Sequence, residues 1–317
     1  MTDPKTVRER LERDVRVGLT AVPPWLPARW FYDEKGSLLF DDITTLPEYY
    51  PTRRETEILA AHGNDIVTAT GATTLIELGA GLSKKTRLIL DAFTAEGRAV
   101  RFVPIDVSAE ALAYAAQTIT DAYPSVLVDA RVADFEDDLA PLPGTPGERL
   151  VLFLGGTIGN LNTGARDDFW AKLRTALTPG DHFLLGADLV KDVDRLVNAY
   201  DDARGVTAAF NRNIIEVLAR ELSAEGLSSD DFAHVARWNP ERSQIEMWLR
   251  AIRPISAYFR TLDLHWSLPT GGELLTEISV KFTLPGLRAE LTHAGLTPVT
   301  TWTDNAGDFS LTLARRD

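Results

Sequence analysis

Acidic side chains and glycines follow two apolar runs of the chain, at a spacing that could hold a nucleoside. The run TTLIEL contains Glu77 and leads into a turn with glycines at Gly79 and Gly81, after which we expect a helix from about Ser83. Glycines at a strand-to-helix turn leave backbone N–H groups free to approach a ligand. The run VRFVPID ends in Asp106, and a carboxylate at this separation suits the two hydroxyls of a ribose.

The loop favours S-adenosylmethionine (SAM) over a dinucleotide as the nucleoside. A dinucleotide fingerprint needs its third glycine where this chain has Lys84. After a later apolar run, Asp134 could accept a hydrogen bond from the adenine amino group while Phe135 covers the ring. Lys85 could meet the carboxylate of the methionine moiety, although a lysine on a helix face is usually only solvated. Each feature alone also fits a glycine turn with acidic helix caps, and their order along the chain is what favours a cofactor site.

A glycine-rich segment, residues 152–162, follows a later strand candidate. Enzymes that methylate the exocyclic amines of bases usually carry an Asn/Asp-Pro-Pro-aromatic sequence at this strand end. The sequence here, LFLGGTIGNLN, has neither a proline nor an aromatic residue to stack a flipped base. A small-molecule substrate therefore fits better. Asn160 could hold an amine or a carboxylate of that substrate, and the alternative is a glycine loop with an asparagine in a left-handed turn.

The segment TEISVKF, residues 276–282, alternates in polarity as a strand does. Glu277, Ser279 and Lys281 are expected on one face of this strand, with apolar side chains on the other. Glu277 and Ser279 could both reach a ring with two nitrogens, while the alternative is a strand with one solvated face. Met247, in an earlier strand candidate, could line a pocket, although a place in the core is the more ordinary outcome.

Strands and helices alternate from residue 73 to residue 188, and this alternation predicts a parallel, doubly wound α/β sheet. Residues 191–222 then look helical, and residues 233–283 look like antiparallel strands. A helix and an antiparallel hairpin over 284–317 commonly complete the Rossmann-like sheet of a class I SAM methyltransferase. We therefore expect two domains, a SAM-dependent methyltransferase domain of residues 60–190 plus 284–317 and a substrate-recognition α+β domain of residues 1–59 plus 191–283.

Composition narrows the class of protein. The chain has 317 residues, no cysteine and five histidines, which are scattered, so we expect neither disulfides nor a metal site. Its formal net charge of −13 repels phosphate backbones, which disfavours nucleic acid as a partner. The first residues are charged and lack an apolar signal core, and no stretch approaches the length of a membrane span. We expect a cytoplasmic monomer that does not bind membranes.

Four segments together resemble a known family. They are FYDEKGSLLFDDITTLPEYYPTRRETEIL (residues 31–59), ELGAGLSKKT, FLGGTIGNL and TEISVKF, in this order and with compatible spacing. The chain thereby resembles the histidine-specific Nα-methyltransferases of ergothioneine biosynthesis over nearly its whole length. The resemblance implies a methyltransferase domain and a second domain that recognises the substrate. It also implies conversion of L-histidine to the betaine hercynine, with three SAM consumed per product.

The resemblance implies roles for residues at matching positions. Tyr49, Glu277 and Ser279 would recognise the imidazole ring of the substrate. Asn160 and Tyr200 would hold the amino-acid head group, and Tyr32 would sit close to the reacting nitrogen, which makes Tyr32 and Asn160 the catalytic candidates. The remaining matches are a pocket wall at Met247 and cofactor positions at Gly79, Lys85, Asp106, Asp134 and Phe135, to which the glycine turn adds Gly81.

The implied chemistry is an in-line attack by the substrate α-amine on the methyl group of SAM, for which the protein mainly positions and deprotonates. A free α-amino group has a pKa of roughly 8 and is mainly protonated at neutral pH, so it must lose a proton before it attacks. A nearby sulfonium cation disfavours the ammonium form. Tyr32, or a water that it holds, could relay the departing proton.

Other activities compete with this expectation. The nearest is the same chemistry on tryptophan or tyrosine, against which Glu277 and Ser279 argue because an apolar ring needs neither. Another is a non-catalytic SAM-binding module, against which the tyrosines of the second domain argue. A nucleic-acid methyltransferase comes third, disfavoured by the charge and by the glycine-rich segment.

Overall fold

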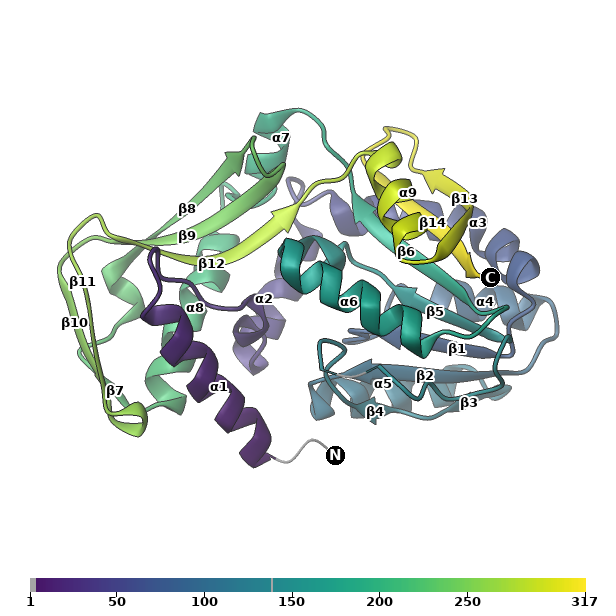
Figure 1. Cartoon of the computed structure of the whole chain (residues 1–317), viewed down its shortest axis with the longest axis horizontal. Coiled ribbons are helices and arrows are strands. Elements are labelled where there is room, and N and C mark those ends of the chain that lie inside the picture. The colour runs from purple at the N-terminus through teal and green to yellow at the C-terminus, as the bar shows by residue number, and fades with distance from the viewer. Residues whose placement is uncertain (1–3, 138) are drawn as a thin grey trace. The chain divides into compact units, whose positions relative to one another are not determined.

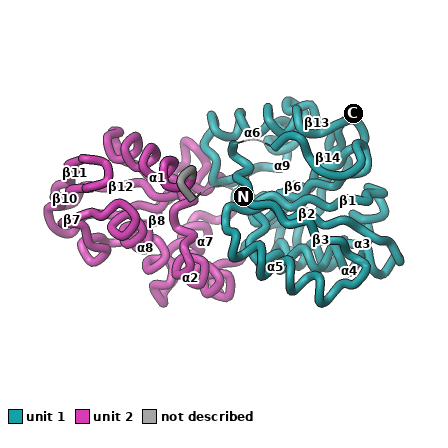
Figure 2. Tube along the Cα trace, turned by 90° about the horizontal axis from the view of Figure 1, so that it is seen from below, with its two compact units in different colours: residues 1–2, 51–190, 281–317 teal, residues 3–50, 191–280 magenta. Residues whose placement is uncertain are grey.

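The computed structural model describes residues 4–137 and 139–317, which form two compact units (Figure 2). The sheet unit consists of Pro51–Val190 and Lys281–Asp317, and the antiparallel unit consists of Lys191–Val280 with the described part of residues 4–50. The sheet unit includes the whole of helix α3 (Pro51–Thr70), whereas the sequence placed a domain boundary inside this helix. The division of cofactor and substrate between two domains stays a prediction.

A large sheet in the order β13-β14-β6-β5-β1-β2-β3 forms the centre of the sheet unit (Figure 1). Neighbouring strands from β3 to β6 run parallel, and β14 and β13 close one side in antiparallel fashion. The segment VLVDARVAD forms two short strands, and both pair with β2. The strands are β1 (Thr74–Leu78), β2 (Val100–Asp106), β3 (Val126–Val128), β4 (Arg131–Val132), β5 (Arg149–Phe153), β6 (His182–Asp188), β13 (Leu296–Thr303) and β14 (Phe309–Arg316).

The strand order reverses direction between β1 and β5. From β1 the chain moves outward to β2 and β3, and it returns to build β5 and β6 on the other side of β1. Open α/β sheets bind ligands at such a reversal, outside the carboxyl ends of the strands. The loops that follow β1, β2 and β4 lie at this edge. They carry the residues that the sequence singled out for a cofactor.

Helices cover both faces of the sheet, with α6 and α9 on one face and α3, α4 and α5 on the other (Figures 1 and 2). Side-chain caps begin α5 (Ala109–Ala122) at Ser108 and α6 (Thr163–Ala176) at Asn162, where each accepts a backbone N–H. Thr283 does the same for α9 (Leu284–His293). Helix α4 (Arg87–Ala95) begins later than the expected position near Ser83, for a reason described with the site.

The antiparallel unit contains the sheets β12-β9-β8 and β11-β10-β7, with helix α8 packed against β8 and β9 (Figure 1). Its core is rich in aromatic side chains, among them Phe31 and Phe210. The register of β12 against β9 shifts between Leu275 and Glu277, which marks a bulge at Thr276. The strands are β7 (Ala224–Glu225), β8 (Phe232–Asn239), β9 (Gln244–Ala251), β10 (Ile255–Phe259), β11 (Leu264–Leu268) and β12 (Glu273–Val280).

The helices of the antiparallel unit come from two parts of the sequence, before Pro51 and after Val190. They are α1 (Pro4–Leu19), α2 (Glu34–Thr45), α7 (Val193–Asn198) and α8 (Val206–Glu221), with 3-10 turns at η1 (Ala28–Phe31), η3 (Ser229–Asp231) and η4 (Arg260–Leu262). The doubly wound sheet and the antiparallel α+β part predicted from the alternation pattern are therefore confirmed as the fold class.

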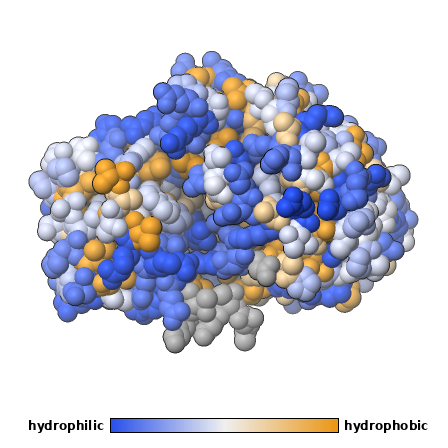
Figure 3. Space-filling model, in the orientation of Figure 1, coloured by the Kyte–Doolittle hydropathy of each residue, from blue (hydrophilic) through white to orange (hydrophobic). Residues whose placement is uncertain are grey.

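Apolar side chains on the face drawn in Figure 3 are dispersed among hydrophilic ones. Such scattered apolar exposure is normal for a folded protein and needs no partner to explain it. Among the described residues, no helix combines the length and the apolar character that a bilayer crossing demands.

Candidate active site

The glycine turn after β1 is tied to the end of β2 by Asp106. Gly79 and Gly81 both adopt positive φ, at 67° and 50°, where a side chain would add strain. The half-buried Asp106 accepts the Gly81 N–H at 2.8 Å through Oδ2 and the Ser108 N–H at 2.9 Å through Oδ1. The carboxylate therefore holds the two loops together at the reversal of the sheet.

Glu77 is a buried carboxylate at the base of this turn. It accepts hydrogen bonds from the hydroxyl of Ser83 at 2.9 Å and from the hydroxyl of Thr86 at 2.5 Å. Burial raises the pKa of Glu77 to about 7, and these two hydrogen bonds oppose the increase. Ser83 itself has a positive φ of 49°, which a continuing helix does not allow. The bond to Glu77 thus explains why α4 begins only at Arg87.

Phe135 lies beside the glycine turn. A Cβ atom on Gly79 would come within 3.5 Å of the Phe135 ring, so the ring and the turn face each other closely. The ring is half-buried and meets Phe153 edge-on with centroids 5.1 Å apart. Asp134 accepts the backbone N–H of Glu136 at 2.8 Å, which shapes the loop that presents Phe135.

Lys85 forms an ion pair with Glu55, a carboxylate that the sequence did not single out. Glu55 lies on α3, is completely buried and also accepts the Gly155 N–H at 2.9 Å through Oε1. A Cβ atom on Gly186 would collide with the same carboxylate. A glutamate on a helix with an exposed face is expected to have a solvated side chain. No local feature of the sequence therefore marks Glu55 as a member of the site.

These contacts in the sheet unit suit the groups of SAM. The open glycine turn gives room and backbone donors, since a Cβ on Gly81 would meet nothing within 4 Å. Asp106 supplies acceptors suited to hydroxyls, Phe135 an aromatic face, and Lys85 a cation. An ammonium group has three N–H donors, so the pair with Glu55 does not exhaust Lys85.

In the antiparallel unit, Tyr200 and Ser279 lie in direct contact. The Tyr200 hydroxyl donates to the Ser279 Oγ at 2.8 Å, and both side chains are buried. Tyr49 packs edge-on against Tyr200 with ring centroids 6.2 Å apart. Three of the residues that the sequence proposed for substrate binding therefore meet within one unit.

Glu277 lies on the same strand as Ser279, directly opposite Met247 of β9. Residues that are opposite each other in an antiparallel pair project on one face of the sheet, so the half-buried Glu277 and the buried Met247 share a face. The bulge at Thr276 comes immediately before Glu277, and bulges change the direction in which neighbouring side chains point.

Tyr32 belongs to the same aromatic cluster but is more open to solvent. It follows η1, and its ring meets Phe40 and Phe210 edge-on with centroids 5.6 Å apart in both cases. Tyr32 is 39% exposed, in contrast to Tyr49 and Tyr200, which are buried. A tyrosine packed on one side and open on the other can exchange a proton with solvent.

Two sequence expectations concern residues that the antiparallel unit does not contain. Asn160 lies in the sheet unit, half-buried at the end of the 3-10 turn η2 (Thr157–Asn160), after two glycines with positive φ. Lys281 was expected to share a strand face with Glu277, but β12 ends one residue before it, at Val280. Lys281 is buried in the sheet unit and pairs with Asp188 at 2.8 Å.

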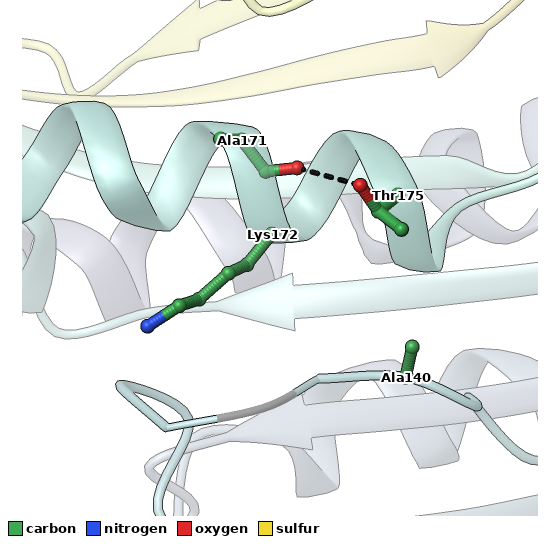
Figure 4. Close-up of a pocket in the computed structure, with 4 residues that line it drawn as sticks. All are labelled: Ala140, Ala171, Lys172 and Thr175. Atoms are coloured by element: carbon green, nitrogen blue, oxygen red, sulfur yellow. Dashed lines mark hydrogen bonds between the residues drawn. The ribbon is translucent and has the colours of Figure 1, made fainter.

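An open hollow beside α6 does not belong to the candidate site (Figure 4). Its lining residues are Ala140, Ala171, Lys172 and Thr175. The Lys172 ammonium donates to the carbonyl oxygen of Glu136, and the Thr175 hydroxyl donates to the Ala171 carbonyl at 3.0 Å. The polar groups of Lys172 and Thr175 are thus both hydrogen-bonded within the protein.

Comparison with known proteins identifies relatives that align with nearly the whole chain. A histidine N-alpha-methyltransferase from Mycolicibacterium smegmatis is 53% identical, with 97% of this chain and 95% of that protein aligned. One from Mycobacterium tuberculosis is 51% identical, with 96% and 95% aligned. A more distant relative is the 4-dimethylallyltryptophan N-methyltransferase easF of Claviceps purpurea, 33% identical over 49% of this chain and 47% of that protein.

The model of the family described as "histidine-specific methyltransferase, SAM-dependent" matches residues 11–316. This match includes every segment on which the resemblance was based, from the aromatic-rich residues 31–59 to TEISVKF. The resemblance inferred from these segments is confirmed. The chain belongs to the family of histidine-specific, SAM-dependent methyltransferases.

Proposed function

We propose that the protein transfers methyl groups from SAM to the α-amino nitrogen of L-histidine, three times in succession, and thereby makes hercynine, the first step of ergothioneine biosynthesis. The observation that carries this proposal is the family match over residues 11–316. The proposal is supported by the hydrogen bond between Tyr200 and Ser279, because Ser279 belongs to the same strand as Glu277.

The residues proposed to hold SAM come from the loops at the reversal of the sheet. Asp106 would bind the ribose, Asp134 the adenine amino group and Phe135 the adenine face, while Lys85 would pair with the methionine carboxylate. The turn at Gly79 and Gly81 would leave room for the nucleoside. The proposed SAM-binding residues are therefore Gly79, Gly81, Lys85, Asp106, Asp134 and Phe135. When bound, SAM supplies a methyl group on a sulfonium, which is a good leaving group.

Recognition of histidine is assigned to the antiparallel unit. Glu277 would accept an imidazole N–H, Ser279 and Tyr49 would contact the same ring, and Met247 would form a pocket wall. A site built around a hydrogen bond to the ring rejects an amino acid whose ring lacks that donor, because its buried polar groups are then unpaired. Asn160 and Tyr200 are proposed to hold the amino-acid head group.

The reacting amine must be neutral before each transfer. Tyr32, half-open to solvent and packed on Phe40 and Phe210, is the proposed neighbour of that nitrogen. It would pass the released proton outward directly or through a water. Because three methyl groups accumulate on one nitrogen, the head-group contacts must tolerate growing bulk, which favours acceptors such as Asn160 that touch only part of the head group.

The test is a mass measurement on the product. The purified protein is incubated with SAM and, separately, with histidine, tryptophan and tyrosine, and the mass of each amino acid is read by mass spectrometry. Three added methyl groups on histidine alone are expected. A gain on tryptophan or tyrosine in place of histidine would reassign the substrate, and no gain on any amino acid would favour a non-catalytic SAM-binding protein.

A further inference from the structure

A chain of buried polar side chains lies behind the residues proposed to bind histidine. The Thr276 Oγ1 lies 2.6 Å from the Asn211 Oδ1, the Asn211 Nδ2 lies 2.8 Å from the His234 Nδ1, and the His234 Nε2 lies 2.8 Å from the carbonyl oxygen of Tyr200. Thr276 and Asn211 are fully buried, and the His234 imidazole is 2% exposed. These residues come from β12, α8 and β8 of the antiparallel unit.

The hydrogen-bond partners of Asn211 and His234 allow one consistent arrangement of the protons on these two side chains. The Asn211 Nδ2 also lies 3.2 Å from the carbonyl oxygen of Trp248, so the Asn211 amide must present its NH₂ group on that side. Its second N–H then points to the His234 Nδ1, which has to be the acceptor. A neutral imidazole has one donor and one acceptor nitrogen. The proton of His234 therefore sits on Nε2 and is donated to the Tyr200 carbonyl.

Both ends of the chain attach to residues of the proposed histidine site. At one end, Tyr200 is held by its backbone and offers its hydroxyl to Ser279. At the other end, Thr276 forms the bulge that precedes Glu277. The loop after α7 and the strand β12 are thereby fixed to each other through His234, although they are far apart in the sequence.

We propose that His234, in the neutral form with its proton on Nε2, is a positioning residue. It holds Tyr200 in the position relative to Glu277 and Ser279 that histidine binding requires. This inference rests on the proposed function. His234 acts through Tyr200 and the Asn211–Thr276 pair, so its loss should weaken histidine binding and leave SAM binding intact.

The surroundings of His234 favour the neutral ring. Burial lowers its pKa, as does the nearby Arg212, while the bond to the Tyr200 carbonyl and the carboxylates of Asp201 and Asp202 oppose this shift. A carboxylate oxygen of Asp201 is 4.0 Å from Nε2. A second proton, on Nδ1, would face the Asn211 NH₂ group. Two donors would then oppose each other, and the hydrogen bond between Asn211 and His234 would be lost.

The kinetic test uses His234→Phe, which keeps a ring, and His234→Gln, which restores a side-chain N–H donor and an acceptor. His265→Phe is the matched control, because His265 is an exposed strand residue of the same unit. The KM for histidine should rise about tenfold in His234→Phe, because this variant loses both buried hydrogen bonds of the ring, with a smaller change in kcat. His234→Gln should recover most of this loss, and the SAM Kd from calorimetry should stay within about twofold in every variant.

A KM for His234→Phe within twofold of the wild type would overturn the proposal, as would a His234→Gln variant no better than His234→Phe. If His234→Phe does not fold, Thr276→Val carries the test, since it removes the hydroxyl at nearly constant volume. We expect its histidine KM to rise about threefold, and an unchanged KM would count against the proposal.

A second readout does not depend on turnover. Two-dimensional NMR of the ¹⁵N-labelled imidazoles, with His234→Gln for assignment, should show His234 as the Nε2–H tautomer at pH 7. A proton on Nδ1, or a charged ring at this pH, would overturn the proposal whatever the substrate. Wild-type protein that leaves histidine unmethylated would instead sink the proposed function, so the two failures are distinguishable.

Discussion

The carboxylate of Glu55 lies between the ammonium group of Lys85 and the backbone N–H of Gly155. Glu55 is fully buried, so it depends on these partners to offset the cost of desolvating its charge. The pair joins helix α3 to the loops that follow β1 and β5. Lys85 is thus placed by a residue that is 30 positions away in the sequence.

We predict that Glu55→Gln lowers the free energy of unfolding by about 2 to 4 kcal/mol, because it leaves Lys85 without its counter-ion. The measurement is urea denaturation of the wild type, Glu55→Gln, Lys85→Met and the double variant. The double variant should lose less stability than the sum of the single ones, by about 1 to 3 kcal/mol. Strictly additive losses would show that the two side chains are not coupled.

Asp106→Ala should weaken SAM binding at least about tenfold, because the carboxylate proposed for the ribose also anchors Gly81 and Ser108. The affinity for histidine should change little. Calorimetry with each ligand separates the two effects, and Asp121→Ala, an exposed aspartate on α5, serves as control. Normal SAM affinity in Asp106→Ala would remove the ribose assignment.

Glu277→Ala should reduce activity on histidine far more than any activity on tryptophan, since this carboxylate is the proposed acceptor of the imidazole N–H. Steady-state kcat/KM for both amino acids provides the comparison. Glu273→Ala on the same strand is the matched control, because Glu273 pairs with Arg237 and Arg250. Equal losses on the two substrates in Glu277→Ala would contradict the selectivity role.

Glu77 should make stability depend on pH between about 4.5 and about 7. Its pKa rises to about 7 on folding because burial disfavours the charged form, so the folded protein holds a proton that the unfolded chain has released. Stability from this group is therefore greatest in acid and is lost as the pH rises through this window, by up to about 3 kcal/mol.

Glu77→Gln removes this titration. The difference in unfolding free energy between Glu77→Gln and the wild type should shift in favour of the variant as the pH increases from 4.5 to 7.5, and then level off. Urea denaturation at a series of pH values gives the two curves, and taking their difference cancels the contributions of other groups. Parallel curves across this range would contradict the assignment.

Local patterns in the sequence predicted those parts of the site that depend on a single strand end. Glu77, Gly79 and Asp106 stand where an apolar run stops, and that position alone places them at the carboxyl edge of a parallel sheet. The doubly wound order followed from the same alternation. The predicted helix exists as α4, but its predicted start near Ser83 was wrong because the Ser83 hydroxyl bonds to Glu77 and the helix begins at Arg87.

Contacts between distant segments could not be predicted in this way. Glu55 appears as one of several charges on a helix, and only its burial against Gly155 and Lys85 shows its role. Asn211 and Thr276 are separated by 65 positions, and no periodicity connects them. Lys281 continued an alternating pattern, and nothing in that pattern predicted its buried ion pair with Asp188.

The paired strands β6 and β14 are synthesised at very different times. β6 ends at Asp188, before residues 191–280 of the antiparallel unit are synthesised, whereas its partner β14 begins only at Phe309. Until that partner emerges, β6 presents open backbone donors and acceptors that can recruit a foreign strand. We expect the nascent chain to be most vulnerable to aggregation during this interval, and chaperones that shield a growing polypeptide to matter most then.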